Sequence, residues 1–109
     1  MATPRPGRPV RGSGTGRPVM AAMDLLGRRW ALRLLWELRD GPRGPRDLLA
    51  SCEGLSSSVL YVRLRELDDA GLVTGGADGW ALTDLGADLG RALRPLDRWA
   101  QRWAETIER

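Results

Sequence analysis

Apolar residues recur at helical spacing over five stretches of this chain, which indicates a mainly helical protein. The first stretch begins at Pro18 and ends at Gly27, and the second extends from about residue 28 to residue 39. Residues 40–42, Asp-Gly-Pro, end the second helix. Apolar side chains surround most of this second helix, so we expect it to be covered on more than one side.

Two helices joined by a tight turn come next. Pro45 suits the first position of a short helix that continues to about Cys52. Ser56 is a good N-cap for a fourth helix that continues to about Ala70. This arrangement is the helix-turn-helix pattern. A buried stripe of leucines in the fourth helix leaves four side chains pointing outward, namely Ser58, Tyr61, Val62 and Arg65.

A β-hairpin follows the fourth helix. Residues 72–74 and 80–82 are two short β segments, and the glycine-rich stretch 75–79 between them predicts a tight connection. A hairpin directly after the second helix of a helix-turn-helix is a wing. The predicted fold class is therefore mainly α with a small β-hairpin (α+β), a winged helix-turn-helix.

The last helix carries a long and narrow apolar stripe. Thr83 caps it, and it extends over about residues 84–108. The stripe consists of Leu85, Leu89, Leu93, Leu96, Trp99, Trp103 and Ile107. Pro95 removes one backbone hydrogen bond and predicts a kink. Because this stripe is too long for one small domain to cover, we expect a homodimer formed by the N- and C-terminal helices.

The length of 109 residues predicts a single ordered domain. Residues 1–16 are rich in arginine, proline and glycine without periodicity, so we expect a disordered tail. The winged helix-turn-helix domain then occupies residues 17–109 and includes the dimerisation helix 84–108. No apolar run is long enough for a membrane span, and no apolar segment of a secretory signal is present.

Positive charge is concentrated in the tail and the middle of the chain. All 17 basic residues are arginine, and residues 28–65 hold eight of them against four acidic residues, whereas 66–109 hold five against nine. This division suits a protein whose middle meets a polyanion. Arg43 and Arg46 belong to this basic middle segment and become candidate DNA contacts.

Enzymatic and metal chemistry have little support in the sequence. The chain has no histidine and a single cysteine, Cys52, so neither an internal disulfide nor a standard zinc site can form. No nucleophile and base pair and no phosphate-binding glycine loop is evident. We therefore expect no enzyme, no metal and no cofactor, with a buried, inert Cys52 and a cytoplasmic location.

The ordered series of motifs resembles the HxlR family of winged-helix regulators, relatives of the MarR and PadR groups. The likeness covers about residues 17–103, and no single motif is specific by itself. It rests on Pro18-Val19, Leu25 to Gly27, Trp30, Leu35 to Pro42, Leu55-Ser56, Leu60, Arg63-Leu64, Glu66-Leu67, Gly71 to Val73, Leu82 to Gly86 and Trp99. The resemblance implies a dimeric DNA-binding repressor or activator whose fourth helix enters the major groove.

The chain departs from the family pattern at four places. Arg17 stands where the family usually has a cysteine, which puts thiol-based sensing in doubt. Ser58 stands where lysine is frequent, and Gly44-Pro45 replaces an expected Arg-Phe pair. The predicted wing is short and carries Asp78 but no basic residue, so the tail arginines are candidates for its contact with the phosphate backbone.

Candidate DNA-binding residues lie on the two helices of the helix-turn-helix. Arginine binds guanine edges and phosphates, and the first turn of a helix favours phosphate. For Arg63, which flanks the core, and for Arg65, the alternative is a solvated helix face. On that face they would pair with Asp68, Asp69 or Glu66. The candidates are Ser56, Ser57, Ser58, Tyr61, Val62, Arg63, Arg65, Arg43 and Arg46. The expected partner is double-stranded DNA with a palindromic operator.

Several tryptophans lie on helices that we expect to meet near the dimer interface. Either they fill core and interface, or they line a pocket for a small aromatic effector; the candidate ligand-binding residues are Trp30, Trp36, Trp99 and Trp103. The expected interface consists of Val19, Met23, Leu89, Leu93, Leu96, Trp99 and Trp103. The leading function is a sequence-specific DNA-binding transcriptional regulator. The alternative is a winged-helix module for protein–protein interaction with little DNA affinity.

Overall fold

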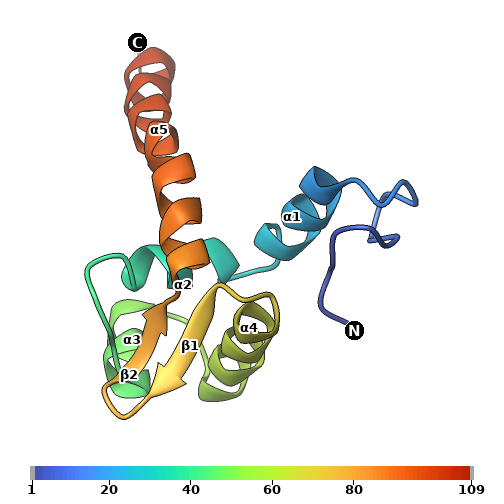
Figure 1. Ribbon diagram of the computed structural model, residues 1–109. Coiled ribbons are helices and arrows are strands. Elements are labelled where there is room, and N and C mark those ends of the chain that lie inside the picture. The colour runs from blue at the N-terminus through green and yellow to red at the C-terminus, as the bar shows by residue number, and fades with distance from the viewer. Residues whose placement is uncertain (1, 109) are drawn as a thin grey trace.

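The computed structural model describes residues 2–108. Within these residues, five helices and one two-stranded antiparallel sheet follow one another (Figure 1). Their bounds are α1 Pro18–Leu26, α2 Ala31–Glu37, α3 Pro45–Ser51, α4 Ser57–Asp69, β1 Val73–Gly76, β2 Gly79–Leu82 and α5 Asp84–Ile107. This is the predicted α+β winged helix-turn-helix fold.

The second helix is shorter than the predicted range 28–39. Residues 28–30 form a turn instead, closed by a hydrogen bond from the Ala31 amide to the Arg28 carbonyl at 3.1 Å. Trp30 caps α2 with a φ of 75°, in the left-handed region that a side chain with a Cβ disfavours. Because the chain changes direction between α1 and α2, residues 28–30 form the connecting turn, although the apolar pattern had predicted them to be helical.

Leucines from four helices make the core. The residues without appreciable exposure are Leu34, Leu38, Leu48, Leu60, Leu64, Leu67, Val73 and Cys52. The predicted leucine stripe of α4 is therefore confirmed. Because the same side chains hold α3 against α4, they fix the two helices of the helix-turn-helix relative to each other.

The hairpin is longer and its turn tighter than predicted. The register pairs Val73 with Leu82 and Gly76 with Gly79, so Gly75 and Gly76 belong to the strand and a two-residue loop, Ala77-Asp78, connects the strands. The segment before α3 joins this sheet, because Arg43 and Trp80 exchange two backbone hydrogen bonds of 2.9 Å. The sequence pattern did not predict this bridge.

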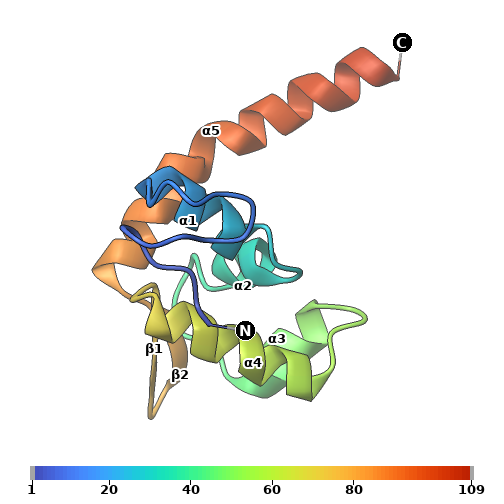
Figure 2. The same cartoon turned by 90° about the vertical axis from the view of Figure 1, so that its right-hand side faces the viewer.

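The last helix leaves the body of the molecule as a long projection (Figures 1 and 2). Thr83 caps it by accepting a hydrogen bond from the Gly86 amide, as predicted, and the helix continues through Pro95. Its first turn packs tightly on the chain after α4, where a Cβ on Gly86 would stand 2.1 Å from the Leu72 carbonyl oxygen. No helix among residues 2–108 is long and apolar enough to cross a membrane.

The N-terminal segment folds back along α1 towards α4 (Figure 2). Residues 2–17 contain no helix, but Val10 and Ser13 form an isolated bridge and the Gly7 amide donates to the Gly16 carbonyl at 2.8 Å. Arg5 forms an exposed ion pair with Asp69 at the end of α4, at 3.0 Å. The predicted disorder of residues 1–16 and the domain boundary at residue 17 stay predictions.

Candidate nucleic-acid interface

The outward face of α4 is the centre of the candidate interface. Ser58, Tyr61, Val62 and Arg65 are all exposed, as their positions relative to the leucine stripe predicted. Tyr61 is 41% exposed and Val62 is 47% exposed, which is high for large hydrophobic side chains. No described part of the chain covers this face.

The start of α4 presents small polar groups beside that face. The Ser56 hydroxyl accepts a hydrogen bond from the Val59 amide at 3.2 Å and so acts as the predicted N-cap. Ser57 and Ser58 are exposed in the first turn, where backbone amides without helical partners face outward. This end of α4 can therefore receive an anionic group such as a phosphate.

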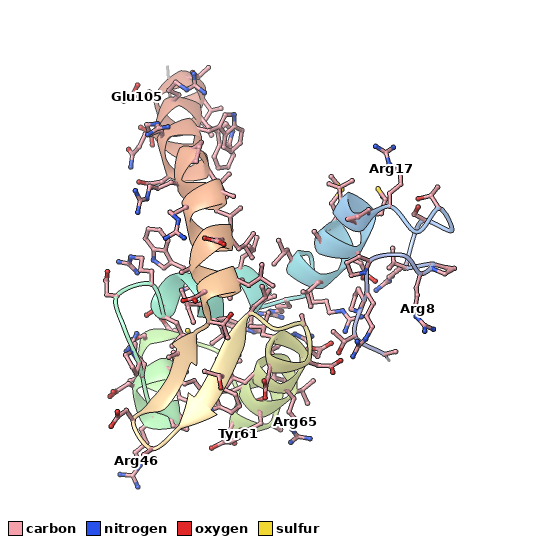
Figure 3. All side chains as sticks on the ribbon, in the orientation of Figure 1. Arg8, Arg17, Arg46, Tyr61, Arg65 and Glu105 are labelled. Carbon is pink, nitrogen blue, oxygen red and sulfur yellow. The ribbon has the colours of Figure 1, made fainter. Side chains whose placement is uncertain are left out.

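Two exposed arginines flank the helix. Arg46 on α3 and Arg65 on α4 point to the same end of the molecule as Tyr61 (Figure 3). Among residues 2–108 neither guanidinium has an ion pair or a hydrogen bond. Their full charge is thus available to an external partner.

The other two candidate arginines are turned into the protein. Arg63 is about one-fifth exposed; its Nε donates to the Arg29 carbonyl at 2.7 Å and its Nη1 lies 2.7 Å from a Glu66 carboxylate oxygen. Arg43 has intramolecular partners too, on Glu37, the Asp47 carbonyl and Ser51. Either residue could contact DNA only by giving up these bonds.

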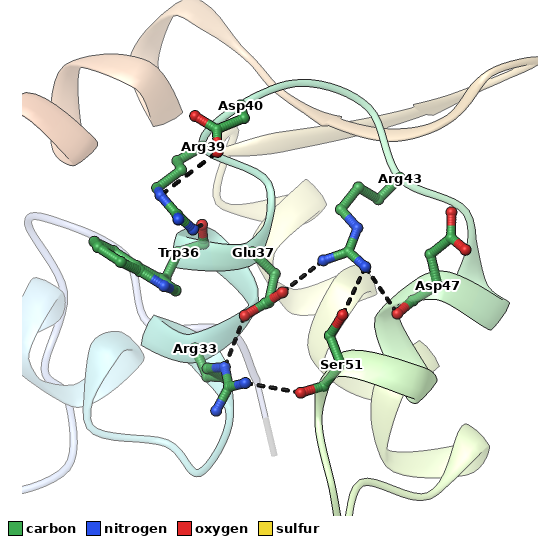
Figure 4. A network of polar contacts seen from close by, with 8 residues as sticks. All are labelled: Arg33, Trp36, Glu37, Arg39, Asp40, Arg43, Asp47 and Ser51. Atoms are coloured by element: carbon green, nitrogen blue, oxygen red, sulfur yellow. Dashed lines mark hydrogen bonds and ion pairs between the residues drawn. The ribbon is translucent and has the colours of Figure 1, made fainter.

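Arg43 belongs to a polar network between α2 and α3 (Figure 4). Glu37 accepts from Arg33 Nε at 2.9 Å and from Arg43 Nη1 at 2.5 Å, and Arg33 also donates to the Ser51 carbonyl at 2.8 Å. The hydrogen bond from Arg33 outweighs partial desolvation and, with that from Arg43, holds the pKa of Glu37 below its ordinary value. The i,i+4 spacing of Arg33 and Glu37 was the one sequence signal for this network.

The hairpin tip offers no positive charge. Residues 74–78 are exposed, and Asp78 in the loop is the one ionisable residue of the hairpin. Arg43, which lies beside β2 through its backbone, directs its guanidinium towards Glu37. The wing can therefore bring backbone amides and a hydroxyl to a phosphate, but no cation.

The four candidate tryptophans occupy different places. Trp36 is half-exposed and carries the Arg39 guanidinium 3.9 Å from its ring centroid. It lines a groove between α2 and α5 together with Leu35, Leu93 and Leu96. Trp30 packs against the core beside Gly54, and Trp99 stacks on Trp103 with centroids 5.6 Å apart. Within one chain, therefore, only Trp36 of the four lines the groove.

Most of the predicted dimer residues form an exposed apolar surface. Val19 and Met23 on α1 are 48% and 62% exposed. On α5 the exposed members are Leu96, Trp99 and Trp103, whereas Leu89 and Leu93 are half-buried near α2. The described chain does not cover this surface.

Cys52 lies at the end of α3 and is fully buried in the leucine core. Desolvation raises the pKa of its thiol above the ordinary value. The predicted burial is confirmed, and both facts disfavour the reactive thiolate.

The helix pair, the hairpin behind it and the exposed α4 define a winged helix-turn-helix protein of the transcription-regulator class. Residues 25–108 match the model of the family described as HxlR-like helix-turn-helix, and the chain belongs to this family. The predicted family is thereby confirmed. The family consists of transcriptional regulators rather than enzymes.

Relatives of known name agree with this assignment. The uncharacterized HTH-type transcriptional regulator YvaP of Bacillus subtilis is 31% identical over 91 residues, which cover 77% of this chain and 84% of YvaP. The quinone-bound structure of YodB from B. subtilis superposes with a TM-score of 0.73 at 27% identity, over 77% of this chain and 96% of YodB. A "possible HxlR family transcriptional factor" from Thermoplasma volcanium has a TM-score of 0.68 at 28% identity, over 77% of this chain and 82% of its own.

Proposed function

We propose that this transcriptional regulator is a sequence-specific DNA-binding homodimer that inserts α4 into the major groove. The observation that carries the proposal is the exposed face of α4, on which Arg65 has no hydrogen bond or ion pair with any of residues 2–108, while Arg63, two residues earlier, is bound inside the fold. A regulator of this kind acts where the genome is, in the cytoplasm.

Each exposed side chain of that face has a chemical role in base reading. Arg65 can donate two hydrogen bonds to a guanine edge, and Val62 can pack against a thymine methyl group. Tyr61 offers a hydroxyl and a ring edge to sugar or base. The Ser57 and Ser58 amides, together with the Arg46 guanidinium, suit backbone phosphates that orient the helix.

The exposed stripe of α5 and the exposed face of α1 support the homodimer. A two-fold interface would bury Val19 and Met23 of α1 together with Trp99 and Trp103 of α5. Two recognition helices would then face successive major grooves, roughly 34 Å apart, so the operator is a palindrome.

We also propose that a small planar aromatic compound modulates binding. The groove between α2 and α5 has an indole wall, Trp36, and apolar leucines opposite it. A relative of this chain, YodB, has been crystallised with a quinone. Trp99 and Trp103, which stack on each other further along α5, would add an aromatic surface in the proposed homodimer.

The test is binding to duplex DNA over a series of salt concentrations. The protein would first select its operator from randomised duplexes, and its affinity for that operator and for an unrelated duplex would then be measured. We expect tight binding to the operator that weakens steeply with salt, because phosphate contacts release counterions. Equal, weak affinity for both duplexes would defeat the proposal.

The alternative function, a module for protein–protein contact, draws on the wing, which has no basic residue, and on Asp68 and Asp69 at the end of α4. These features reduce the positive charge of the candidate interface. If the selection yields no operator, capture of a protein partner through the same α4 face becomes the better description.

A further inference from the structure

Four charged side chains gather on the flank of α4 that faces the linker between α1 and α2. They are Asp24 of α1, Arg28 of the following linker, and Arg63 and Glu66 of α4. Glu66 accepts from Arg28 through one oxygen and from Arg63 through the other, the latter at 2.7 Å. All four are between 9% and 22% exposed, so water screens these pairs weakly.

The same cluster holds the backbone of the linker between α1 and α2. Arg63 Nε donates to the Arg29 carbonyl at 2.7 Å. The next residue, Trp30, has a φ of 75°, a conformation that persists only where surrounding contacts impose it. Contacts from α4 thus accompany the strained residue at which the chain turns from α1 into α2.

This linker connects α1 to α2, and α1 lies to one side of the rest of the domain (Figures 1 and 2). The outer face of α1 bears Val19 and Met23, the exposed residues assigned above to the dimer interface. The direction of α1 relative to α4 therefore depends on the turn at residues 27–30 and on the ion pairs that bind Arg28 to Glu66. In a homodimer, that direction contributes to the separation and rotation of the two recognition helices.

We propose that Arg63 and Glu66 are positioning residues that set the half-site spacing of the operator. They bind no base; they lock α1, and with it the partner subunit, to one orientation relative to α4. One base pair more or less moves a half-site by roughly 3.4 Å and rotates it by roughly 35°, so a rigid dimer discriminates between neighbouring spacings. This inference rests on the proposed DNA-binding homodimer.

The test uses the full-length protein and its selected palindrome with the central spacer changed by one and two base pairs in each direction. We expect the wild-type protein to prefer one spacing by about tenfold or more over its neighbours, since a mismatched spacing must be met by deforming DNA or protein. In Arg63→Gln this preference should shrink to about threefold or less, with dimerisation by sedimentation unchanged. Glu66→Gln, which keeps the shape of the side chain, should have the same effect.

The matched control is Arg65→Gln on the outer face of the same helix. It should weaken binding to every spacing by a similar factor and leave the preference as it is, because Arg65 forms no hydrogen bond or ion pair with the linker. Thermal unfolding reports which variants are folded at the assay temperature. One folded variant, either Arg63→Gln or Glu66→Gln, is enough to test the positioning role. A folded, dimeric variant with the wild-type spacing profile would overturn the positioning role alone, whereas a wild-type protein that binds no operator would overturn both proposals.

Discussion

Two arginines of α4 show how position within a single helical turn decides what a side chain does. Arg63 and Arg65 lie about 200° apart around the helix axis. Arg63 bonds to Glu66 and to the Arg29 carbonyl, while Arg65 forms no hydrogen bond or ion pair with any other described residue. The arginine at position 63 therefore stabilises the fold, whereas the arginine at position 65 has a charge that is available to an external partner.

Replacing Arg65 by alanine tests the reading role directly. We expect operator affinity to fall by about 1–3 kcal/mol with the melting temperature unchanged, because the residue has no hydrogen bond or ion pair to lose within the described part of the chain. Arg98→Ala on α5 is the control, since that arginine is exposed on another element. Fluorescence anisotropy with the selected duplex measures the operator affinity of both variants. Undiminished affinity in Arg65→Ala would show that this residue is not part of the interface.

Glu37 predicts how stability depends on pH. Hydrogen bonds from Arg33 and Arg43 keep its pKa in the folded protein below the ordinary value of 4.5. The stabilisation from the charged form is complete above that value and is lost as pH falls through the lower, folded pKa. Glu37→Gln should therefore be less stable than the wild type at pH 7, and the difference should narrow under acid conditions. Urea unfolding at pH 7 and pH 3.5 measures this; a constant difference would contradict the assignment.

At the scale of elements, the packing of α5 on the body depends on one glycine. The first turn of α5 approaches the chain after α4 so closely that a Cβ on Gly86 would meet both the Leu72 carbonyl and the Leu82 side chain. Thr83 adds a hydrogen bond from its hydroxyl to the Gly71 carbonyl at 2.6 Å. These contacts orient the projecting helix relative to the hairpin.

Gly86→Ala should displace the start of α5 and destabilise the fold by about 1–3 kcal/mol, the usual range for overpacking. Gly90→Ala, one turn further on, is the matched control. A Cβ there meets nothing within 4 Å, so the substitution should stabilise α5 by about 0.5–1 kcal/mol through its helix propensity. Thermal unfolding of the two variants should shift in opposite directions, and equal shifts would show that the contact with Leu72 is easily relieved.

For the whole molecule, the long α5 exposes more apolar surface than a monomer should leave in water. Leu96, Trp99, Trp103 and Ile107 are about half exposed or more, and the two indoles stack on each other. Their burial against a second copy would remove this surface from water. The dimer is thus the larger structural unit on which the palindromic operator and the spacing inference both depend.

Trp103→Ala should weaken the dimer, because truncation of a tryptophan buried in an interface costs about 3–5 kcal/mol. Sedimentation at micromolar concentration should show a shift towards monomer. Gln101→Ala, an exposed position outside the stripe, should leave the sedimentation profile unchanged. If the wild-type protein itself sediments as a monomer, the dimer and the palindrome both fail.

Removing residues 2–16 should weaken operator binding and flatten its salt dependence. Arg8 lies beside α1, apart from the end of the molecule where Arg46 and Arg65 lie (Figure 3), but a segment of this length can extend to about 50 Å. Its ion pair between Arg5 and Asp69 is exposed and costs little to break. Loss of three arginines should reduce the salt slope by up to about three units, and an unchanged slope would make the tail irrelevant to DNA.

The sequence by itself determined the elements whose signals are local. Ser56 and Thr83 cap α4 and α5 because a hydroxyl at that position bonds an amide within its own turn. The leucine period of α4 predicted which side is buried and therefore which side chains are exposed. The order of helices, hairpin and long last helix also predicted the winged helix-turn-helix and the family.

Only the tertiary structure decided the features that join distant parts of the chain. The start of α2 depends on a turn to which α4 is bonded through Arg63. The segment before α3 joins the hairpin through the backbone bridge between Arg43 and Trp80. In the sequence, Arg43 and Arg63 could not be distinguished from Arg46 and Arg65, because all four are basic residues of the same segment. The acceptors of Arg43 and Arg63 come from elements up to 34 residues away, and a local pattern contains no information about which distant carbonyl or carboxylate will lie within hydrogen-bond reach.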